Sequence, residues 1–435
     1  MRHLLPFLTL LFGMALPASA QQALSLHFAP RAMQAQETNP AFFNEKLITI
    51  SLPSPYVSVL HSGFTYRDLI QPVGDSLRLD IPGALSQMEE MNDLRLFSQV
   101  DILGIGVKLA MFQVTAGARA RTDVLVSYPR DLVALGWEGN AAHLDETLSL
   151  GPTGYARAWS EIYLGGAIRV TKKIQIGARA KYLVGLADAT FTRHDLTLYT
   201  NPEIYQLEAR ADYVLHTSVL NLGQDLSSPD FVFEPQVFGP NRGWAVDLGL
   251  RVQPIKQLEL AASLTDLGFI DWNAQSQRYE ATGTLAFAGL DAAQLLDEDS
   301  LSMDFIDELA DSLLQGMELR SSPDMYRTYL PAKAYVSATF RPIKLLKVGV
   351  LYHAESYGGR TRQALAVHGG VDVGKILNTG LTWSLQDGRA GHLGAHAYLK
   401  LGPAALLLAT DNVLAFIQPD RARTTNARLG LNLCF

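Results

Sequence analysis

Apolar and polar residues alternate along much of this chain. The pattern is clearest in residues 113–126, 244–252, 333–341 and 392–401, where apolar side chains occupy every second position and the positions between carry charge, glycine or hydroxyl groups. A period of two places these two sets on opposite faces of a β-strand. A soluble β-sandwich contains such strands too, so the order and spacing of the strands decide the type of sheet.

The alternation predicts fourteen strands, most of them long enough for the roughly 9–11 residues that a tilted membrane-spanning strand needs. The predicted strands are residues 56–66, 98–109, 112–126, 157–170, 174–187, 243–252, 256–265, 332–341, 344–353, 363–373, 376–385, 392–401, 404–411 and 425–435. Their connections alternate in length. The short connections are 110–111, 171–173, 253–255, 342–343, 374–375 and 402–403. The long ones are 67–97, 127–156, 188–242, 266–331, 354–362, 386–391 and 412–424.

Short turns at one end and longer loops at the other are typical of a transmembrane barrel, whereas a sandwich has no reason to keep its tight turns together. We therefore predict an all-β fold, a transmembrane antiparallel β-barrel of about 14 strands with an N-terminal lumenal segment and long extracellular loops. Both termini should share the periplasmic end with the turns at Lys172, Pro254, Pro342 and Gly402. The loops that contain Pro229 and Asp299 should lie at the extracellular end.

Four segments do not fit the up-and-down pattern. Residues 291–316 have apolar side chains at helical spacing and a dense acidic face, which predicts a surface helix in the longest loop. Its carboxylates lack the spacing of a calcium-binding loop, so a solvated acidic face is favoured over a calcium site. Residues 84–95 are predicted to be a second short helix, and residues 206–218 and 276–287 to be hairpins above the membrane.

The N-terminus has the pattern of a secretory signal peptide. A positive start is followed by an apolar stretch at residues 4–16 and by the small residues Ala18 and Ala20, which predicts cleavage between Ala20 and Gln21. An N-terminal anchor helix is disfavoured because the apolar stretch is too short to span a bilayer. The predicted organisation is a signal peptide at 1–20, a plug-like segment at 21–46 and an outer-membrane barrel at 47–435.

The last predicted strand ends in an aromatic residue, Phe435. In this it resembles outer-membrane barrels, whose last strand commonly ends in Phe that the assembly machinery recognises. We therefore predict that Phe435 is an assembly signal, with an unimportant frayed terminus as the alternative. The predicted location is the outer membrane of a Gram-negative bacterium, and the predicted partners include its lipid and the barrel-assembly machinery.

The segment before the first strand contains Asn39-Pro40-Ala41-Phe42. Here the chain resembles the long-chain fatty-acid transporter (FadL-like) family, which has fourteen strands and an N-terminal hatch inside the lumen followed by an Asn-Pro-Ala segment. It is also similar to type IX secretion (PorV-like) barrels and to an uncharacterised family of outer-membrane barrels. The resemblance implies a plug or ligand site at these four residues. A simple tight turn is the alternative, because Pro40 favours an extended Asn39 whose side chain can bond to nearby backbone. The large insertions 188–242 and 266–331 depart from the family pattern.

Composition narrows the class of partner. Hydrophobic residues make up 48% of the chain and charged residues 18%, which fits a barrel in which only every second residue faces lipid. No apolar run reaches the roughly 18 residues of a membrane helix. The net charge of −7 argues against nucleic acid, which needs a basic surface. The single cysteine, Cys434, excludes an intrachain disulfide.

The residues that could carry enzyme or metal chemistry form no matching motif. The chain lacks a G-x-S-x-G nucleophile elbow, and Gly104-Ile105-Gly106 sits inside a predicted strand with no helix after it, unlike a nucleotide loop. His392 and His396 should point into the lumen, but no third metal ligand accompanies them. We therefore predict no enzyme activity, no cofactor and no metal.

The charges on the lumenal face are the remaining functional clue. Alternation predicts lumen-facing side chains at Arg119, Arg121, Asp123, Arg169, Arg179, Lys181, Asp247, Arg251, Lys333, Arg341, Asp372, His392, His396 and Lys400. Mixed charges inside a barrel can close the interior by ion pairing or line a polar path. One hypothesis is therefore uptake of a small hydrophobic ligand, gated by the segment at Asn39-Pro40-Ala41. The other is a scaffold that presents its long loops to a secretion component.

One observation separates these hypotheses most cheaply. An apolar opening beside Phe42, continuous through the lumen or through the wall, would favour transport. A lumen filled throughout by the Arg and Asp side chains would count against it.

Overall fold

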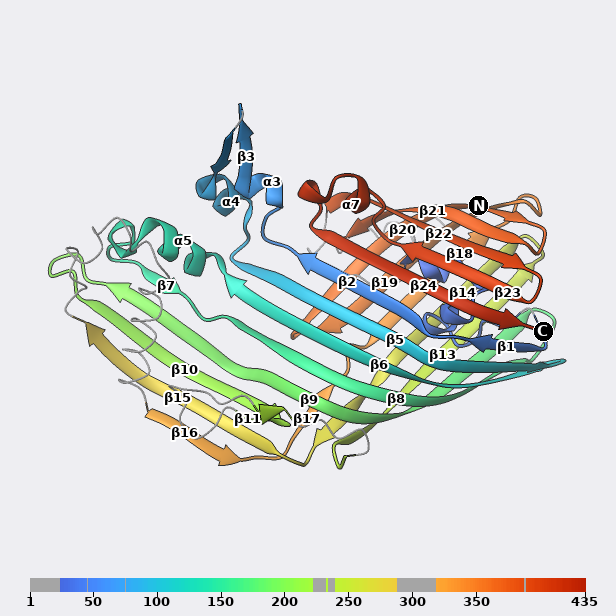
Figure 1. Cartoon of the computed structure of the whole chain (residues 1–435), viewed down its shortest axis with the longest axis horizontal. Coiled ribbons are helices and arrows are strands. Elements are labelled where there is room, and N and C mark those ends of the chain that lie inside the picture. The colour runs from blue at the N-terminus through green and yellow to red at the C-terminus, as the bar shows by residue number, and fades with distance from the viewer. Residues whose placement is uncertain are drawn as a thin grey trace, which may run out of the picture.

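The strands close on themselves into one barrel (Figure 1). The computed structural model describes residues 24–44, 46–74, 76–221, 232–233, 239–287, 318–386 and 389–435. The predicted signal peptide and the acidic helix 291–316 lie outside these residues. The barrel has 14 antiparallel strands, so the predicted fold class is confirmed.

The wall contains every strand of the up-and-down pattern. In order around the barrel its strands are β1 (Ile48–Ser51) continued by β2 (Ser54–His61), β5 (Met91–Leu109), β6 (Phe112–Pro129), β8 (Thr153–Arg169), β9 (Ile174–Thr200), β13 (Arg242–Ile255), β14 (Leu258–Trp272), β18 (Lys333–Phe340) with β17 (Tyr326–Tyr329) before it, β19 (Leu346–Tyr357), β20 (Arg360–Val373), β21 (Leu377–Gln386), β22 (Arg389–Leu401), β23 (Ala404–Thr410) and β24 (Thr424–Cys434). β24 pairs with both β1 and β2, and the Phe435 amide donates to the Ile48 carbonyl over 2.8 Å. Closure leaves the barrel without an unpaired edge.

The first wall strand lies earlier than predicted. The predicted strand 56–66 is wrong at both ends, because β1 and β2 together cover residues 48–61 and residues 66–69 form the short helix α3 (Tyr66–Leu69). The strand is interrupted between β1 and β2, where Pro53 has no N–H to donate to a neighbouring strand. This interruption breaks the alternation from which the strand was predicted.

The predicted helix at 84–95 is also misplaced. The helix is α4 (Ile81–Gln87), and β5 starts at Met91. Asp80 caps α4, since its side chain accepts a 3.0 Å hydrogen bond from the Gly83 amide, and Pro82 occupies the first turn. These are the usual signals of a helix start.

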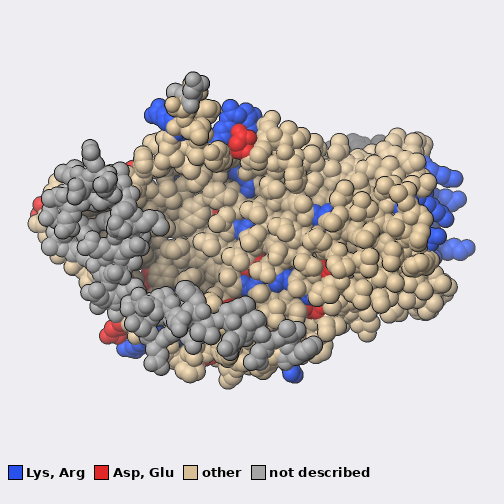
Figure 2. All heavy atoms as spheres, viewed as in Figure 1, with Lys and Arg blue, Asp and Glu red and all other residues tan. Residues whose placement is uncertain are grey.

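The outer surface of the barrel is apolar. Large hydrophobic side chains point outward at every second position, as in Ile162 and Leu164 of β8, Trp244 of β13 and Val336 of β18, each more than half exposed. In Figure 2 the part of the barrel next to the end with the blue side chains is a mostly tan band with few charges. Such a band is the lipid-facing surface of a membrane barrel. Among the described helices, none has the length and apolar character to cross a membrane.

The sheet extends well beyond the barrel at the end opposite the short turns (Figure 1). β9 pairs with β13 up to Val184, and from Asp188 onward it pairs instead with β10 (Leu207–Ser218). β10 pairs with β15 (Ser276–Phe287), and β15 with β16 (Glu318–Pro323). The segments predicted as separate hairpins at 206–218 and 276–287 therefore join one continuous sheet.

Two of the remaining elements, α2 (Leu24–His27) and η1 (Met33–Glu37), precede the first strand and are buried inside the barrel. The others lie in the long connections between wall strands: β3 (Ile70–Val73), β4 (Ser76–Leu79), α5 (Arg130–Glu138), η2 (Asn140–Ala142), β7 (Thr147–Ser149), β11 (Leu220–Asn221), β12 (Val232–Phe233), α7 (Leu414–Ile417) and η3 (Pro419–Arg421). Leu135 of α5 packs with Leu148, Leu198 and Leu207 against the sheet extension. This apolar cluster holds the extension in place outside the barrel.

Candidate functional site

Residues 24–44 lie inside the lumen and form what we call the plug. Its side chains are almost all buried, including Leu26, Gln34 and Asn39. The plug contains only the short helices α2 and η1 before the turn at Asn39-Pro40-Ala41. In that turn the Asn39 Oδ1 accepts a 2.9 Å hydrogen bond from the Ala41 amide, so the Asn side chain closes the turn locally.

Two glycines of the wall make room for this turn. Gly177 of β9 and Gly249 of β13 are directly paired across the two strands. A Cβ at Gly177 would lie 2.4 Å from the Pro40 carbonyl carbon, and one at Gly249 would lie 2.2 Å from the Asn39 Oδ1. Side chains at these positions would displace the plug. Other wall glycines that the plug approaches closely are Gly104, Gly106, Gly349, Gly394 and Gly430.

Polar contacts fix the plug to strands on several sides of the barrel. The Asn39 amide donates to the carbonyls of Leu250 (3.1 Å) and Ala262 (3.3 Å), which belong to β13 and β14. His27 bridges the plug to the wall, with Nδ1 2.9 Å from the Thr38 Oγ1 and Nε2 2.8 Å from the Ser337 Oγ of β18. Burial lowers the pKa of His27 to about 4, so the docked imidazole is neutral.

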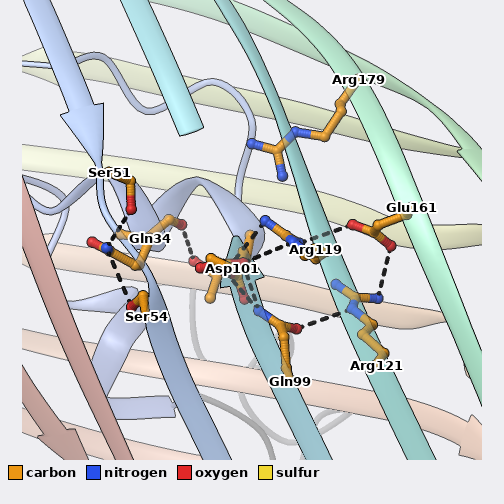
Figure 3. A network of polar contacts seen from close by, with 12 residues as sticks. Gln34, Ser51, Ser54, Gln99, Asp101, Arg119, Arg121, Glu161 and Arg179 are labelled. Carbon is orange, nitrogen blue, oxygen red and sulfur yellow. Dashed lines mark hydrogen bonds and ion pairs between the residues drawn. The ribbon is translucent and has the colours of Figure 1, made fainter. Parts of the chain in front are cut away.

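A buried carboxylate anchors the plug by charge. Glu37 lies 3.1 Å from Arg428 of β24 and 3.3 Å from Arg119 of β6, and Gln99 donates to it over 2.9 Å. Burial alone would raise the pKa of Glu37, but the guanidinium groups of Arg119, Arg428 and Arg121, with the Gln99 hydrogen bond, hold its pKa well below the ordinary value. Figure 3 shows this network continuing from Asp101 and Arg119 to Glu161.

A second layer of ion pairs fills the lumen near the plug. Asp266 of β14 lies 2.9 Å from Arg121 of β6 and 2.9 Å from Lys333 of β18. Arg95 of β5 lies 3.1 Å from Glu355 of β19. β5 and β19 stand on opposite sides of the barrel, so this ion pair crosses the lumen. All five side chains are buried.

The predicted lumen-facing residues do not all join this network. Arg119, Arg121, Arg179, Asp247 and His396 are buried, whereas Arg169, Arg251 and His392 are half-buried nearer the ends. The two histidines do not form a pair; His396 stacks on His368 instead, with ring centroids 5.2 Å apart. Within the described residues no three His, Cys, Asp or Glu side chains are placed to hold a metal ion.

Several residues of the site were missed from the sequence. Asp101, Glu161 and Glu355 sit on the lumenal faces of their strands, and alternation could have identified them. Asp266 could not be found in this way, because it stands at a positive φ of 59° where the register with β13 shifts. Glu37 belongs to the plug, which has no strand period to follow.

Two cavities lie at the two ends of the lumen. The outer cavity, of about 580 Å³, includes Leu125, Tyr155, Phe191 and Tyr357 in its lining. The inner cavity, of about 280 Å³, opens beside the short turns and touches Phe43 of the plug.

Phe42 lines neither of the two cavities. It packs in an apolar cluster with Leu26, Ala261, Tyr398 and Leu407. The apolar opening expected beside Phe42 for a standing hydrophobic path is therefore not found among the described cavities, and charged side chains cross the lumen as in a closed interior.

Comparisons with known proteins give the family. No curated protein is significantly similar to the chain. Among solved structures, the chain is similar to the Pseudomonas putida toluene transporter TodX (8% identity, 97% of each chain covered, TM-score 0.43). It is also similar to the Ralstonia pickettii toluene transporter TbuX (11% identity, 92% of this chain and 93% of that chain covered, TM-score 0.45). A Pseudomonas aeruginosa FadL homologue gives 11% identity over 96% of this chain and 98% of that chain, with a TM-score of 0.43.

A family model described as "Family of unknown function (DUF5723)" matches residues 40–411, from the plug turn to the end of the barrel's thirteenth strand. The chain therefore belongs to the DUF5723 family.

Proposed function

We propose that the protein is a gated outer-membrane transporter for small hydrophobic ligands, and that the plug is its gate. The observation that carries the proposal is the position of the plug between the outer and the inner cavity. A path between the two cavities opens when the plug is displaced and the ion pairs that cross the lumen separate. Ion pairs cross the lumen and Phe42 is buried. The described arrangement is therefore the closed state of such a gate.

The outer cavity has the size and lining of a small-molecule site. Its volume of about 580 Å³ falls within the roughly 300–1,000 Å³ of ordinary ligand pockets. Aromatic rings from four separate strands contribute to its lining: Tyr155, Phe191, Tyr329 and Tyr357. Such rings bind the apolar body of a ligand and offer hydroxyl groups for its polar end.

The polar contacts that hold the plug are of a kind that water can replace. Asn39, His27 and Glu37 bind the wall through hydrogen bonds and ion pairs, with no covalent link. When the plug moves, the exposed polar groups of the lumen can be hydrated. A plug docked only on apolar surface would instead expose that surface to water at a cost of about 25 cal/mol per Å².

The proposal extends to the location of the barrel and to its assembly. We propose that the apolar outer band contacts outer-membrane lipid, that the signal peptide is removed between Ala20 and Gln21, and that Phe435 is the signal for the barrel-assembly machinery. Phe435 is 57% exposed beside the first strand, where another protein can reach it.

Uptake of a hydrophobic dye tests transport directly. Cells producing the protein should take up N-phenyl-1-naphthylamine faster than cells without it. Phe191→Ala, which removes a ring from the outer cavity, should slow this uptake several-fold. Tyr205→Ala is the matched control, because Tyr205 is an exposed aromatic residue outside the cavity. Equal uptake with and without the protein would reject the transport proposal.

The sheet extension favours a second function, that of a scaffold. β10, β15 and β16 carry the sheet far outside the barrel, which a transport path does not require. In this case the connection 288–317, between β15 and β16 of the extension, would bind a secretion component or another outer-membrane protein. Replacing residues 288–317 by a short Gly-Ser linker should then abolish co-purification of the partner and leave dye uptake unchanged.

A further inference from the structure

Lysine is confined to one end of the barrel surface. The chain has eleven lysines, and two of them, Lys181 and Lys333, are buried in the lumen. The long connections at the opposite end contain none. Figure 2 shows the short-turn end with blue side chains and no red ones on this face. The other nine lysines lie in or beside the short turns or just before the first strand: Lys46, Lys108, Lys172, Lys173, Lys256, Lys344, Lys347, Lys375 and Lys400.

Acidic groups at this end are too few to balance the basic ones. Within four residues of the six short turns, the acidic residues are Glu259 and Asp372. The segment before the first strand adds Glu45 and Lys46, and the chain ends in the carboxylate of Phe435. The basic residues within four residues of the turns are Lys108, Arg169, Lys172, Lys173, Lys256, Arg341, Lys344, Lys347, Lys375 and Lys400. Because the whole chain has a net charge of −7, this positive balance is specific to the short-turn end.

Five of the lysines project outward from three strand connections and the turn before β9. Lys172, Lys173, Lys256, Lys344 and Lys375 are exposed, and none of them forms an ion pair with another described residue. A lysine carries its charge on a flexible four-carbon stem, which can lie along apolar surface while the ammonium group stays in a polar layer. Their ammonium groups are therefore available to an anionic partner outside the barrel.

Each of the six turns also exposes a large apolar side chain. In three turns this side chain is the direct neighbour of an exposed lysine, as in Ile255-Lys256, Ile343-Lys344 and Lys375-Ile376. The apolar side chains continue the lipid-facing band of the wall to its edge. They are Met111, Val170, Ile255, Ile343, Ile376 and Leu401, each more than half exposed. This combination of apolar residues and lysines suits the boundary between acyl chains and headgroups.

We infer that the short-turn end of the barrel binds the headgroups of anionic phospholipids in the leaflet that surrounds it. The turns are only two to five residues long, so their lysines lie at the edge of the apolar band and not far out in water. The apolar side chains of the turns enter the acyl region, and the lysines reach the phosphate groups beside it. With the topology predicted above, this is the periplasmic leaflet. The inference does not depend on the transport proposal.

Native mass spectrometry of the purified full-length barrel in non-ionic detergent tests the inference. Dioleoyl phosphatidylglycerol should bind more tightly than dioleoyl phosphatidylcholine, which has the same acyl chains and no net charge, by about fivefold for each lysine engaged. A variant without the five exposed lysines should lose this preference and bind phosphatidylcholine as before, which a misfolded barrel would not do. Its substitutions are Lys172→Gln, Lys173→Gln, Lys256→Gln, Lys344→Gln and Lys375→Gln.

A second variant removes the same amount of charge away from the short turns and should keep the preference. Its substitutions are at exposed residues: Arg78→Gln, Arg130→Gln, Arg210→Gln, Arg320→Gln and Arg421→Gln. Equal affinity of the unsubstituted barrel for the two lipids would overturn the inference and assign the lysines to a partner other than lipid. An equal loss of preference in both variants would also overturn it, because net charge and not position would then be the cause. A lysine variant that retains the preference would overturn it as well.

Discussion

At the residue scale, the paired glycines under the plug turn are a sensitive point of the site. Gly249→Ala introduces a Cβ 2.2 Å from the Asn39 Oδ1, and the plug must shift to accommodate it. We expect the docked state to lose about 1–3 kcal/mol, the usual cost of overpacking. Amide hydrogen exchange of residues 24–44 should speed up accordingly.

The control for that substitution lies elsewhere in the wall. Gly369 of β20 has no atom within 4 Å of where its Cβ would be, so Gly369→Ala should leave exchange of the plug unchanged. Slow exchange in Gly249→Ala, equal to that of the unsubstituted protein, would show that the turn does not depend on this close contact.

His27 should make docking of the plug dependent on pH. Its pKa falls from 6.5 when free to about 4 when docked, because burial disfavours the charged ring. The docked state thus binds fewer protons, and its stability is intact above pH 6.5 and lost progressively as the pH falls towards 4. A pKa shift of this size corresponds to a full loss of about 3 kcal/mol in the stability of the docked state.

Hydrogen exchange of the plug at pH 7 and pH 5, corrected for intrinsic rates, measures this effect. His27→Gln keeps groups that can bond to Thr38 and Ser337 but does not titrate, so it should lose this part of the pH dependence. Identical pH dependence in the variant would assign the effect to other groups.

The sequence predicted the faces of the site better than its pairings. Alternation predicts Arg119, Arg121 and Asp247 on the inward face because strand geometry is local, and all three side chains are buried. Their partners come from strands far along the chain, or from the plug in the case of Glu37, and no local pattern encodes those pairings.

At the element scale, the prediction was accurate where strands are regular. β6, β20 and β24 lie within a few residues of their predicted bounds, because turn residues flank long alternating segments. It failed where Pro53 interrupts the first strand and where β9 runs on for 27 residues, far more than a membrane crossing needs. The part of β9 that continues beyond the barrel pairs with β10. This pairing depends on tertiary contacts, which the alternation pattern does not encode.

The orientation of these elements can be tested by labelling. Glu208 lies on the exposed face of the extension in β10, and Lys172 lies in a short turn at the opposite end. In a Cys434→Ser background, Glu208→Cys should react with a membrane-impermeant maleimide in intact cells. Lys172→Cys should react only after the outer membrane is permeabilised. Equal labelling of both in intact cells would contradict the assigned topology.

At the scale of the whole molecule, the lumen is divided into layers. The aromatic outer cavity is followed inward by the ion pairs of Asp266 and Arg95, then by the plug, and then by the basic inner cavity. A buried ion pair adds little to the stability of a fold, but removing one of its two partners is strongly destabilising. This arrangement suits a barrel with one defined closed state, from which a gate can be released.

The most direct test of gating is to lock the plug in place. The three atoms nearest to a Cβ at Gly430 all belong to the Gln34 side chain, with its Cδ 2.9 Å away, so we expect cysteines at positions 34 and 430 to form a disulfide. In a Cys434→Ser background, Gln34→Cys/Gly430→Cys should reduce N-phenyl-1-naphthylamine uptake to the level of cells without the protein when oxidised. Reduction of the same protein should restore uptake. Equal uptake in the oxidised and reduced states would contradict the claim that the plug is the gate.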